Sequence, residues 1–276
     1  MARNSNWAPA FYGYLGASFY YEEAFRILCL TPEDVKDLSS ALRLDGGHPD
    51  DDARLLLEKA LSWYRTIPTI NRKRQAFPPE KFSIARSTEI ISLATRVCPS
   101  SVDFTPGPND VSLKSVDRIT LKALCMLLFW PSWELAYMWN AFFQLSHKHE
   151  RRKELEKSME LIRKSYPKEN DPRKLGHEAM YRLFRGALLR EESAFMEADM
   201  ELSLLVPYPD YTCYTEMIEK WTIEFAKYER GLCKWEMGEK KQAVIWWNAV
   251  RDSGHFLDPR LKFRVKSALR RAEGTI

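Results

Sequence analysis

Few residues in the sequence have the type and spacing that catalysis or metal binding requires. His147 and His149 are two positions apart, which on a helix points their side chains to different sides, so a shared metal ion is not expected. Acidic residues occur as adjacent pairs, at 22–23 and 191–192, which cannot face one substrate and are interpreted as solvated. The motifs of metalloproteases, serine hydrolases and phosphate-binding loops do not occur. The sequence therefore predicts no catalytic residue, no metal ion and no cofactor.

The cysteines do not form a chemical motif either. Cys233 lies on a predicted helix face, where a small core residue is the expected role and a nucleophile is the alternative. No two cysteines are separated by two residues, which favours free, mostly buried thiols in a reducing compartment. The five are Cys29, Cys98, Cys125, Cys213 and Cys233.

Charge is nearly balanced in the 276-residue chain, with 42 basic and 38 acidic residues. The most basic segments, residues 71–75 and 147–153, are interpreted as solvated helix ends rather than as sites for nucleic acid or membrane. The most apolar segment, residues 123–133, is much shorter than the ~20 residues of a membrane-spanning helix. The N-terminus has no apolar secretory core. We therefore expect a soluble protein with no transmembrane segment and no nucleic-acid partner.

Helical periodicity extends over most of the chain, and no segment alternates as a strand does. A hydrophobic content of 45% with only 11 glycines favours helices that pack through large side chains. Helical hairpins are predicted for residues 1–97, a loop for residues 98–115, and further helices for residues 116–276, all in one continuous domain. The predicted helices include residues 7–19, 21–30, 78–97, 116–130, 132–146 and 149–165, with a last helix from about residue 258.

Two C-terminal segments share a pattern typical of tetratricopeptide repeats, in which a small residue on the first helix lets the second helix approach closely. Gly231 is followed twelve residues later by Ala243, and Trp247 continues the buried stripe of the second helix. The upstream counterparts are Gly186, Ala198 and Leu202. The two glycines are 45 residues apart, whereas the usual repeat has ~34 residues, so an extended helix is expected between them.

A third, degenerate copy of the pattern is predicted at the N-terminus. Ala24 and Leu28 match the second helix there, and Tyr12 occupies the close-packing position. The predicted fold is an all-α solenoid of antiparallel helix pairs, made of degenerate tetratricopeptide-like repeats. In the last pair, Trp247 should pack within its own hairpin and Trp246 should face a neighbouring helix, because adjacent helical residues point about 100° apart.

Several segments resemble a known family. "WELAYMWNAF" resembles a Glu-x-x-Tyr-x-Trp-Asn motif through Glu134, Tyr137, Trp139 and Asn140. "WAPAFYGYLGASFYYEEA", "LFRGALLR", "FAKYERGLCKW" and "DPRLKFRVKSAL" resemble further segments of the same family. It is the family of the fungal inclusion body clearance proteins, which are related to the animal tetratricopeptide repeat proteins of group thirty-nine. The likeness covers nearly the whole chain but only the C-terminal half of such a protein, so a longer protein is expected.

The resemblance implies a non-enzymatic helical-repeat protein that binds protein partners, in the cytoplasm and with the nucleus as a second compartment. Fungal members of the family are linked to the clearance of misfolded-protein inclusions in cooperation with lipid droplets. The alternative is a helical lipid- or small-molecule-binding protein, or an enzyme, with an apolar cavity near residues 123–143.

A helical array presents a concave face formed by its successive first helices, and a partner is expected to bind there. The predicted partner-binding residues are Leu183, Arg190, Glu191, Tyr228, Trp235 and Glu236. For Trp235 the alternative is internal packing, with the C-terminal helix covering it as a cap. Asn140 is interpreted as a buried structural amide, with ligand contact as the alternative, and Trp139 belongs to the same structural motif.

Overall fold

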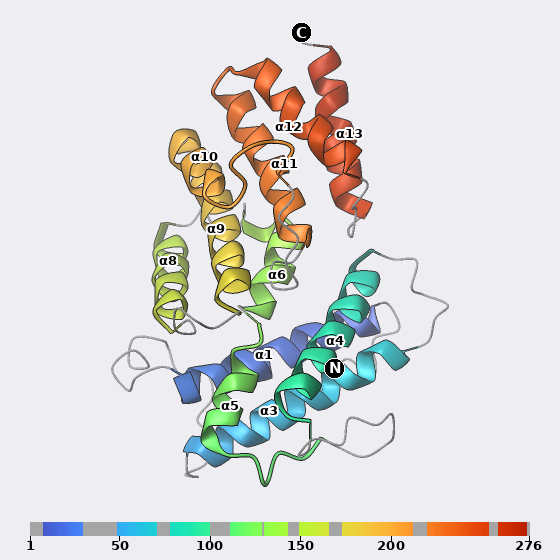
Figure 1. The fold of residues 1–276 in the computed structure, drawn as a ribbon, viewed down its shortest axis with the longest axis vertical. Coiled ribbons are helices and arrows are strands. Elements are labelled where there is room, and N and C mark those ends of the chain that lie inside the picture. Colours follow the sequence, from blue (N-terminus) through green and yellow to red (C-terminus); the bar gives the residue numbers. More distant parts are fainter. Residues whose placement is uncertain are drawn as a thin grey trace. The chain divides into compact units, whose positions relative to one another are not determined.

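The computed structural model describes residues 8–29, 49–70, 78–99, 111–128, 130–142, 149–165, 173–211, 220–253 and 259–274. Within these ranges all regular structure is helical, which confirms the all-α class (Figure 1). None of the described helices has both the length and the apolar composition needed to cross a membrane. The predictions for His147, Cys213, the basic segment 71–75 and residues 100–110 of the loop lie outside the described residues.

The chain divides into two compact units, Met1–Leu135 and Ala136–Ile276. In the N-terminal unit, α1 and α3 form the most extensive helix pair, and α4 and α5 pack against both. Three aspartates in the first turn of α3 favour its start, because carboxylates complement the N-terminal end of the helix dipole. The helices of this unit are α1 (Pro9–Cys29), α3 (Pro49–Thr66), the 3-10 turn η2 (Ile67–Thr69), α4 (Pro78–Val97), α5 (Arg118–Cys125) and the first part of α6 (Pro131–Met138).

The predicted N-terminal helix pair is wrong, because α1 is one continuous helix. Tyr12 and Ala24 therefore lie on the same helix and cannot face each other across a hairpin. Ala24 and Leu28 are buried, while Tyr12 is 39% exposed. The helix continues through residue 20 because no proline or left-handed residue interrupts it there.

Residues 116–135 were predicted to belong with the C-terminal helices. The N-terminal unit instead includes residues 111–135. Tyr21 on α1 explains part of this grouping. Its hydroxyl donates to the Leu124 carbonyl oxygen at 2.9 Å and accepts a hydrogen bond from the Leu128 backbone N–H at 3.1 Å. One buried side chain thus holds the C-terminal end of α5 against α1.

Two helices of the N-terminal unit have their first turns capped by a glutamate from another helix. Glu80 on α4 accepts hydrogen bonds from the backbone N–H groups of Phe11, at 2.9 Å, and Ala10, at 3.4 Å. Glu22 on α1 accepts from the backbone N–H and the hydroxyl of Ser132, at 2.6 and 2.8 Å. Because the first N–H groups of a helix have no partner within it, these contacts fix the starts of α1 and α6.

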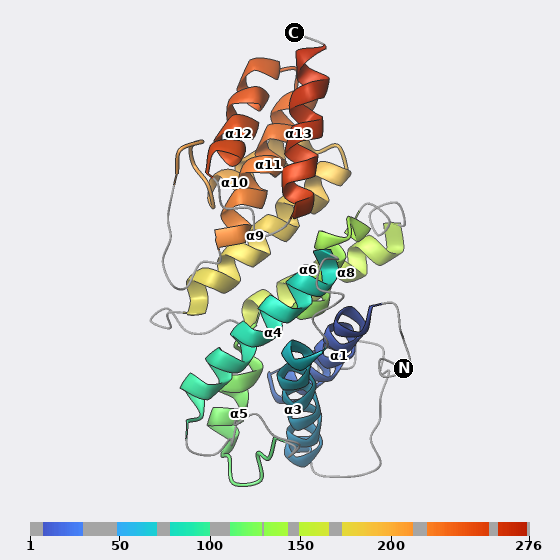
Figure 2. The ribbon, with the colours of Figure 1, turned by 90° about the vertical axis from the view of Figure 1, so that its right-hand side faces the viewer.

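The C-terminal unit consists mainly of helices that pack in sequence order (Figure 2). α9 pairs with α10, α11 contacts both of them and pairs with α12, and α13 packs against α12. The helices are α8 (His149–Lys164), α9 (Arg173–Glu191), α10 (Phe195–Ser203), α11 (Lys220–Glu236), α12 (Lys240–Asp252) and α13 (Pro259–Glu273), after the end of α6.

The predicted glycine contacts occur in both hairpins. A Cβ atom at Gly186 would lie 2.5 Å from Cγ of Leu202, and one at Gly231 would lie 2.3 Å from Nε1 of Trp247. Both distances are far below van der Waals contact, so only glycine allows these helix pairs to approach so closely. The indole N–H of Trp247 also donates to the Tyr228 carbonyl oxygen at 3.3 Å, which places Trp247 within its own hairpin as predicted.

The turns of the two hairpins also match at the same 45-residue offset. Ser193 and Gly238 have left-handed φ values of 63° and 82°. In each turn the next residue donates its backbone N–H to a carbonyl five residues earlier, from Ala194 to Leu189 at 3.0 Å and from Glu239 to Lys234 at 2.9 Å. This is the Schellman geometry of helix C-termini. The α9–α10 and α11–α12 hairpins are therefore two copies of one local structure.

Candidate interaction surface

Two of the predicted partner-binding residues are not on a surface. Leu183 is completely buried and Tyr228 is 8% exposed. Burial raises the pKa of Tyr228 to about 12, and the negative charge of Glu229 adds to this rise. Both residues were expected on an accessible concave face, and that expectation is wrong because neighbouring helices cover them.

Arg190 and Glu191 form an internal polar network instead of an open binding site. Arg190 Nε donates to Glu229 at 2.5 Å, and its terminal nitrogen donates to Glu191 at 2.6 Å. The other Glu229 oxygen accepts a hydrogen bond from the Tyr137 hydroxyl at 2.9 Å. Burial lowers the pKa of Arg190, but Glu229 and Glu191 raise it by more, so the guanidinium stays charged. The network joins α6, α9 and α11.

Glu229 is the centre of this network, and the sequence prediction did not include it. It is one of several charged residues on α11, where residues 221–231 are all buried. Charged residues usually indicate a solvent-facing side of a helix, so their burial here depends on partners from other helices. The sign that the sequence did offer was an aromatic residue next to a charged one, as in Glu224–Phe225 and Tyr228–Glu229.

Trp235 is half-buried, and Glu236 is exposed. The Trp235 ring lies 5.6 Å from the Trp247 ring, centroid to centroid, at an interplanar angle of 36°. Two cations lie over it, Lys240 at 5.4 Å and Arg271 at 6.0 Å from the ring centroid. Because Arg271 belongs to α13, the C-terminal helix partly covers Trp235, as in the capping alternative.

Trp246 was expected to face a neighbouring helix. The contact that the structure shows is with Arg230, whose guanidinium lies 4.3 Å from the Trp246 ring centroid. Arg230 is on α11, so this contact lies within the hairpin. Arg230 also binds the Asp199 carboxylate of α10, at 2.6 Å, and thereby connects the two hairpins.

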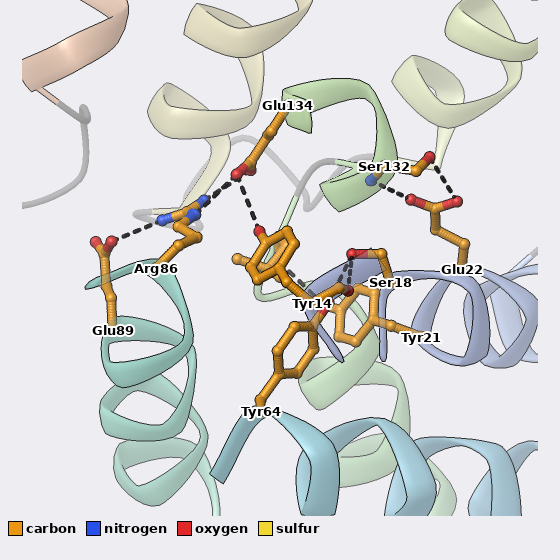
Figure 3. A network of polar contacts seen from close by, with 10 residues as sticks. Tyr14, Ser18, Tyr21, Glu22, Tyr64, Arg86, Glu89, Ser132 and Glu134 are labelled. Carbon is orange, nitrogen blue, oxygen red and sulfur yellow. Dashed lines mark hydrogen bonds and ion pairs between the residues drawn. The ribbon is translucent and has the colours of Figure 1, made fainter. Parts of the chain in front are cut away.

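Glu134, the first residue of the Glu-x-x-Tyr-x-Trp-Asn motif, is completely buried in the N-terminal unit (Figure 3). Arg86 on α4 donates two hydrogen bonds to its carboxylate, at 2.8 and 2.9 Å, and the Tyr14 hydroxyl donates a third at 3.3 Å. Burial raises the pKa of Glu134, while the charge of Arg86 opposes this rise. The paired charges and the surrounding tyrosines make this a structural network.

Glu22 lies at the edge of the same region (Figure 3). The sequence interpretation of the 22–23 and 191–192 pairs as solvated is wrong for Glu22, which is 8% exposed, and for the Glu191 side chain, which is 8% exposed. Burial raises the pKa of Glu22 to about 8, although the two hydrogen bonds from Ser132 lower it. The Glu22 carboxylate contacts α6, and the Glu191 carboxylate pairs with Arg190 on its own helix, which sequence adjacency alone could not show.

Asn140 is not the buried amide that the sequence suggested. It is exposed, has a φ of 59°, and donates its backbone N–H to the Tyr137 carbonyl oxygen at 2.9 Å. Asparagine tolerates left-handed backbone better than most residues, so Asn140 ends α6 after Met138. The predicted helix over residues 132–146 is therefore interrupted. The preceding Trp139 is 41% exposed, with the Arg260 guanidinium 5.2 Å from its ring centroid.

The environments of Cys29 and Cys233 disfavour the reactive thiolate form, because both thiols have a raised pKa. Burial raises the pKa of Cys233 to about 12 and that of Cys29 to about 11. Cys233 is completely buried, which confirms it as a core residue. Within the described ranges, no three His, Cys, Asp or Glu side chains are grouped so that they could hold a metal ion.

The C-terminal unit has exposed apolar side chains on and next to α10. Met196 and Met200 on α10 and Leu204, its C-cap residue, are 65%, 65% and 67% exposed and recur every four residues. We call these three residues the α10 row. Ile245 on α12 is 48% exposed and stands 45 residues after Met200, at the equivalent position of the second hairpin. The sequence prediction missed this row, although its four-residue spacing was visible.

The C-terminal unit also has two surface hollows. One, of about 290 Å³, lies between α8 and α9 beside Met159 and Tyr181. The other, of about 650 Å³, lies between α12 and α13. It is lined by Arg251, Lys262, Val265, Lys266, Leu269, Arg270 and Glu273.

Comparison of the chain with protein-family models, with curated proteins and with solved structures finds no match.

Proposed function

We propose that this chain is a non-enzymatic helical-repeat protein that binds protein partners. The observation that carries the proposal is the pair of equivalent hairpins, α9–α10 and α11–α12, with the same glycine contacts and the same turns. Stacked helical hairpins are the unit of solenoid proteins, whose extended surfaces recognise other proteins. A degenerate tetratricopeptide-like solenoid is the architecture we propose for the C-terminal unit.

The distribution of polar groups supports binding rather than catalysis. The best-defined charged clusters, around Glu134 and around Glu229, are closed by ion pairs and hydrogen bonds between helices. The alternative function requires the segment 123–143 as the lining of an apolar cavity, but Leu124, Leu128 and Tyr137 of this segment are packed in the core. Tyr137 alone contacts the rings of Phe142, Phe184 and Phe225, at 5.3 to 5.8 Å between centroids.

The α10 row is the surface on which we expect a partner, in the form of an amphipathic helix. Three apolar residues four positions apart form a ridge that fits between the side chains of a second helix. Glu197 is exposed directly beside Met196 and favours basic residues along the edge of the partner helix. Exposed apolar patches of this kind commonly mark protein-binding sites. The resemblance to the inclusion body clearance proteins adds the proposal that such partners act in removing misfolded protein with lipid droplets, in the cytoplasm or nucleus.

Affinity purification with quantitative mass spectrometry tests the proposal, using the full chain and two variants. Met196→Glu/Met200→Glu should lose specific partners, whereas Leu175→Glu, at an exposed position on α9, should keep them. A recovered partner must then bind the purified wild-type chain directly and fail to bind the α10-row variant. A tightly retained small molecule in native mass spectrometry, together with partners indifferent to the row, would support the cavity-containing alternative instead.

A further inference from the structure

α13 carries most of the excess positive charge of the chain. Its fifteen residues include six Lys or Arg residues and a single acid, Glu273. The whole chain has a net charge of only +4, so the remainder is close to neutral. Two arginines in the last turn complement the helix dipole, which leaves most of the excess unexplained by helix stability.

These cations occupy two sides of α13. Arg260, Arg264 and Arg271 contact groups of the same unit: the Trp139 ring, the Met138 carbonyl oxygen and the Trp235 ring. The others line the groove toward α12.

In the groove, Lys262, Lys266 and Arg270 are exposed and lie opposite Arg251 of α12. Arg251 pairs with Asp252, but both side chains are more than half exposed, so that pair is weak and readily exchanged. Among the described residues, neither Lys266 nor Arg270 has an ion-pair or hydrogen-bond partner. Val265, which is buried, and Leu269, which is half-buried, add apolar lining between the cations.

We infer that the α12–α13 groove binds an acidic segment of a partner protein, one in which carboxylates alternate with aliphatic side chains. The inference rests on the proposed protein-binding function and specifies the chemistry of one partner. Carboxylates would pair with Lys266, Arg270 and Lys262, and an aliphatic side chain between them would contact the half-buried Leu269. A groove of about 650 Å³ accommodates a short peptide segment.

Two other anionic partners fit the groove less well. Insertion into a lipid surface needs protruding apolar side chains, but Phe263, the large apolar residue of α13 that is 72% exposed, points about 100° away from Lys262 and so out of the groove. Single-stranded nucleic acid is held largely by stacking on aromatic rings, and the residues that line the groove include none.

Fluorescence polarisation with the full chain tests the inference. The probe is a fluorescein-labelled synthetic peptide in which glutamate alternates with leucine, and the reference probe has lysine in place of glutamate. We expect the wild type to bind only the acidic peptide, more weakly as salt increases. Lys266→Glu/Arg270→Glu should weaken binding by about tenfold or more. Lys153→Glu/Lys164→Glu, which makes the same charge change at exposed positions of α8, should leave it unchanged.

Equal binding by the groove variant and the wild type would overturn the inference, provided that circular dichroism shows both to be folded. Tighter binding of polyuridine RNA or of phosphatidylserine vesicles than of the acidic peptide would also overturn it. Failure of the proposed function gives a different result, namely that no partner depends on the α10 row. If partners still depend on Met196 and Met200 while the acidic peptide does not bind, only the groove inference fails.

Discussion

At the scale of single residues, three buried glutamates connect different helices. Glu134 is neutralised by Arg86, Glu22 caps the start of α6, and Glu229 holds Tyr137 and Arg190. Sequence reasoning could not find these roles, because each partner lies 39 to 110 residues away along the chain. Glu134 and Tyr137 of the Glu-x-x-Tyr-x-Trp-Asn motif therefore each connect α6 to another helix.

Substitutions at Asn140 can show whether its left-handed backbone or its side-chain amide contributes to stability. Asn140→Leu should lower the free energy of unfolding by about 1 kcal/mol, because a leucine side chain is strained at a φ of 59°. Asn140→Gly should be neutral or slightly stabilising. Urea denaturation monitored by circular dichroism measures both. An equal loss in the two variants would show that the amide group itself is required.

Glu22 should make stability depend on pH. Its pKa is about 8 in the folded chain and 4.5 as the ordinary value, so the folded state retains the proton over this range while the unfolded state releases it. The Glu22 contribution is therefore fully present below about pH 4.5 and is lost as pH rises to about 8, by up to ~1.4 kcal/mol per pH unit.

Glu22→Gln removes this titration, so the stability of the variant relative to the wild type should increase between those two pH values. Urea denaturation across the range measures the difference. Glu236→Gln, at an exposed position of α11, is the control for the loss of one carboxylate. A constant difference between Glu22→Gln and the wild type would mean that Glu22 is ionised throughout.

At the scale of helices, the hairpin register was predictable and the helix ends were less so. Gly186 and Gly231 identified the positions where two helices approach closely, because a small residue among large ones leaves room for a side chain of the second helix. The continuous α1 and the early end of α6 were missed. Helical periodicity continues through both regions, and only the backbone conformation at residues such as Asn140 determines where a helix stops.

Alanine at either close-packing glycine should destabilise the chain. Gly186→Ala and Gly231→Ala place a methyl group 2.5 and 2.3 Å from Leu202 and Trp247, so the helices must separate at a cost of about 1–3 kcal/mol each. Gly16→Ala is the control, because its nearest neighbour, the Trp63 ring, is 3.8 Å away. It should be neutral or stabilise by up to ~1 kcal/mol through helix propensity. Thermal melts in which all three variants behave alike would show that the hairpin contacts are looser.

At the scale of the whole molecule, the all-helical class followed from composition and periodicity, but the division after Leu135 did not. The loop at 98–115, rich in Pro and Ser, was the strongest break in the sequence. The structure divides the chain later because α5 is held to α1 through the buried Tyr21 hydroxyl, a contact that no local pattern reveals.

Each unit should fold without the other if its own contacts are sufficient. Fragments 1–138 and 131–276 both retain α6, which supplies Glu134 to one unit and Tyr137 to the other. We expect both fragments to be helical by circular dichroism and to unfold cooperatively in urea. A fragment that unfolds gradually would show that its core is incomplete.

The pairing of Trp235 with Trp247 also gives the second hairpin an optical signature. Indole rings 5.6 Å apart and inclined by 36° are close enough for their excited states to couple, which produces paired bands of opposite sign in the circular dichroism of aromatic side chains. Trp130 and Trp133 form another pair with centroids 5.6 Å apart, so the contribution of Trp235–Trp247 is the part of the signal that Trp235→Phe removes. That part arises only while α11 and α12 are closed on each other, and it would report the opening of this one hairpin in the intact protein.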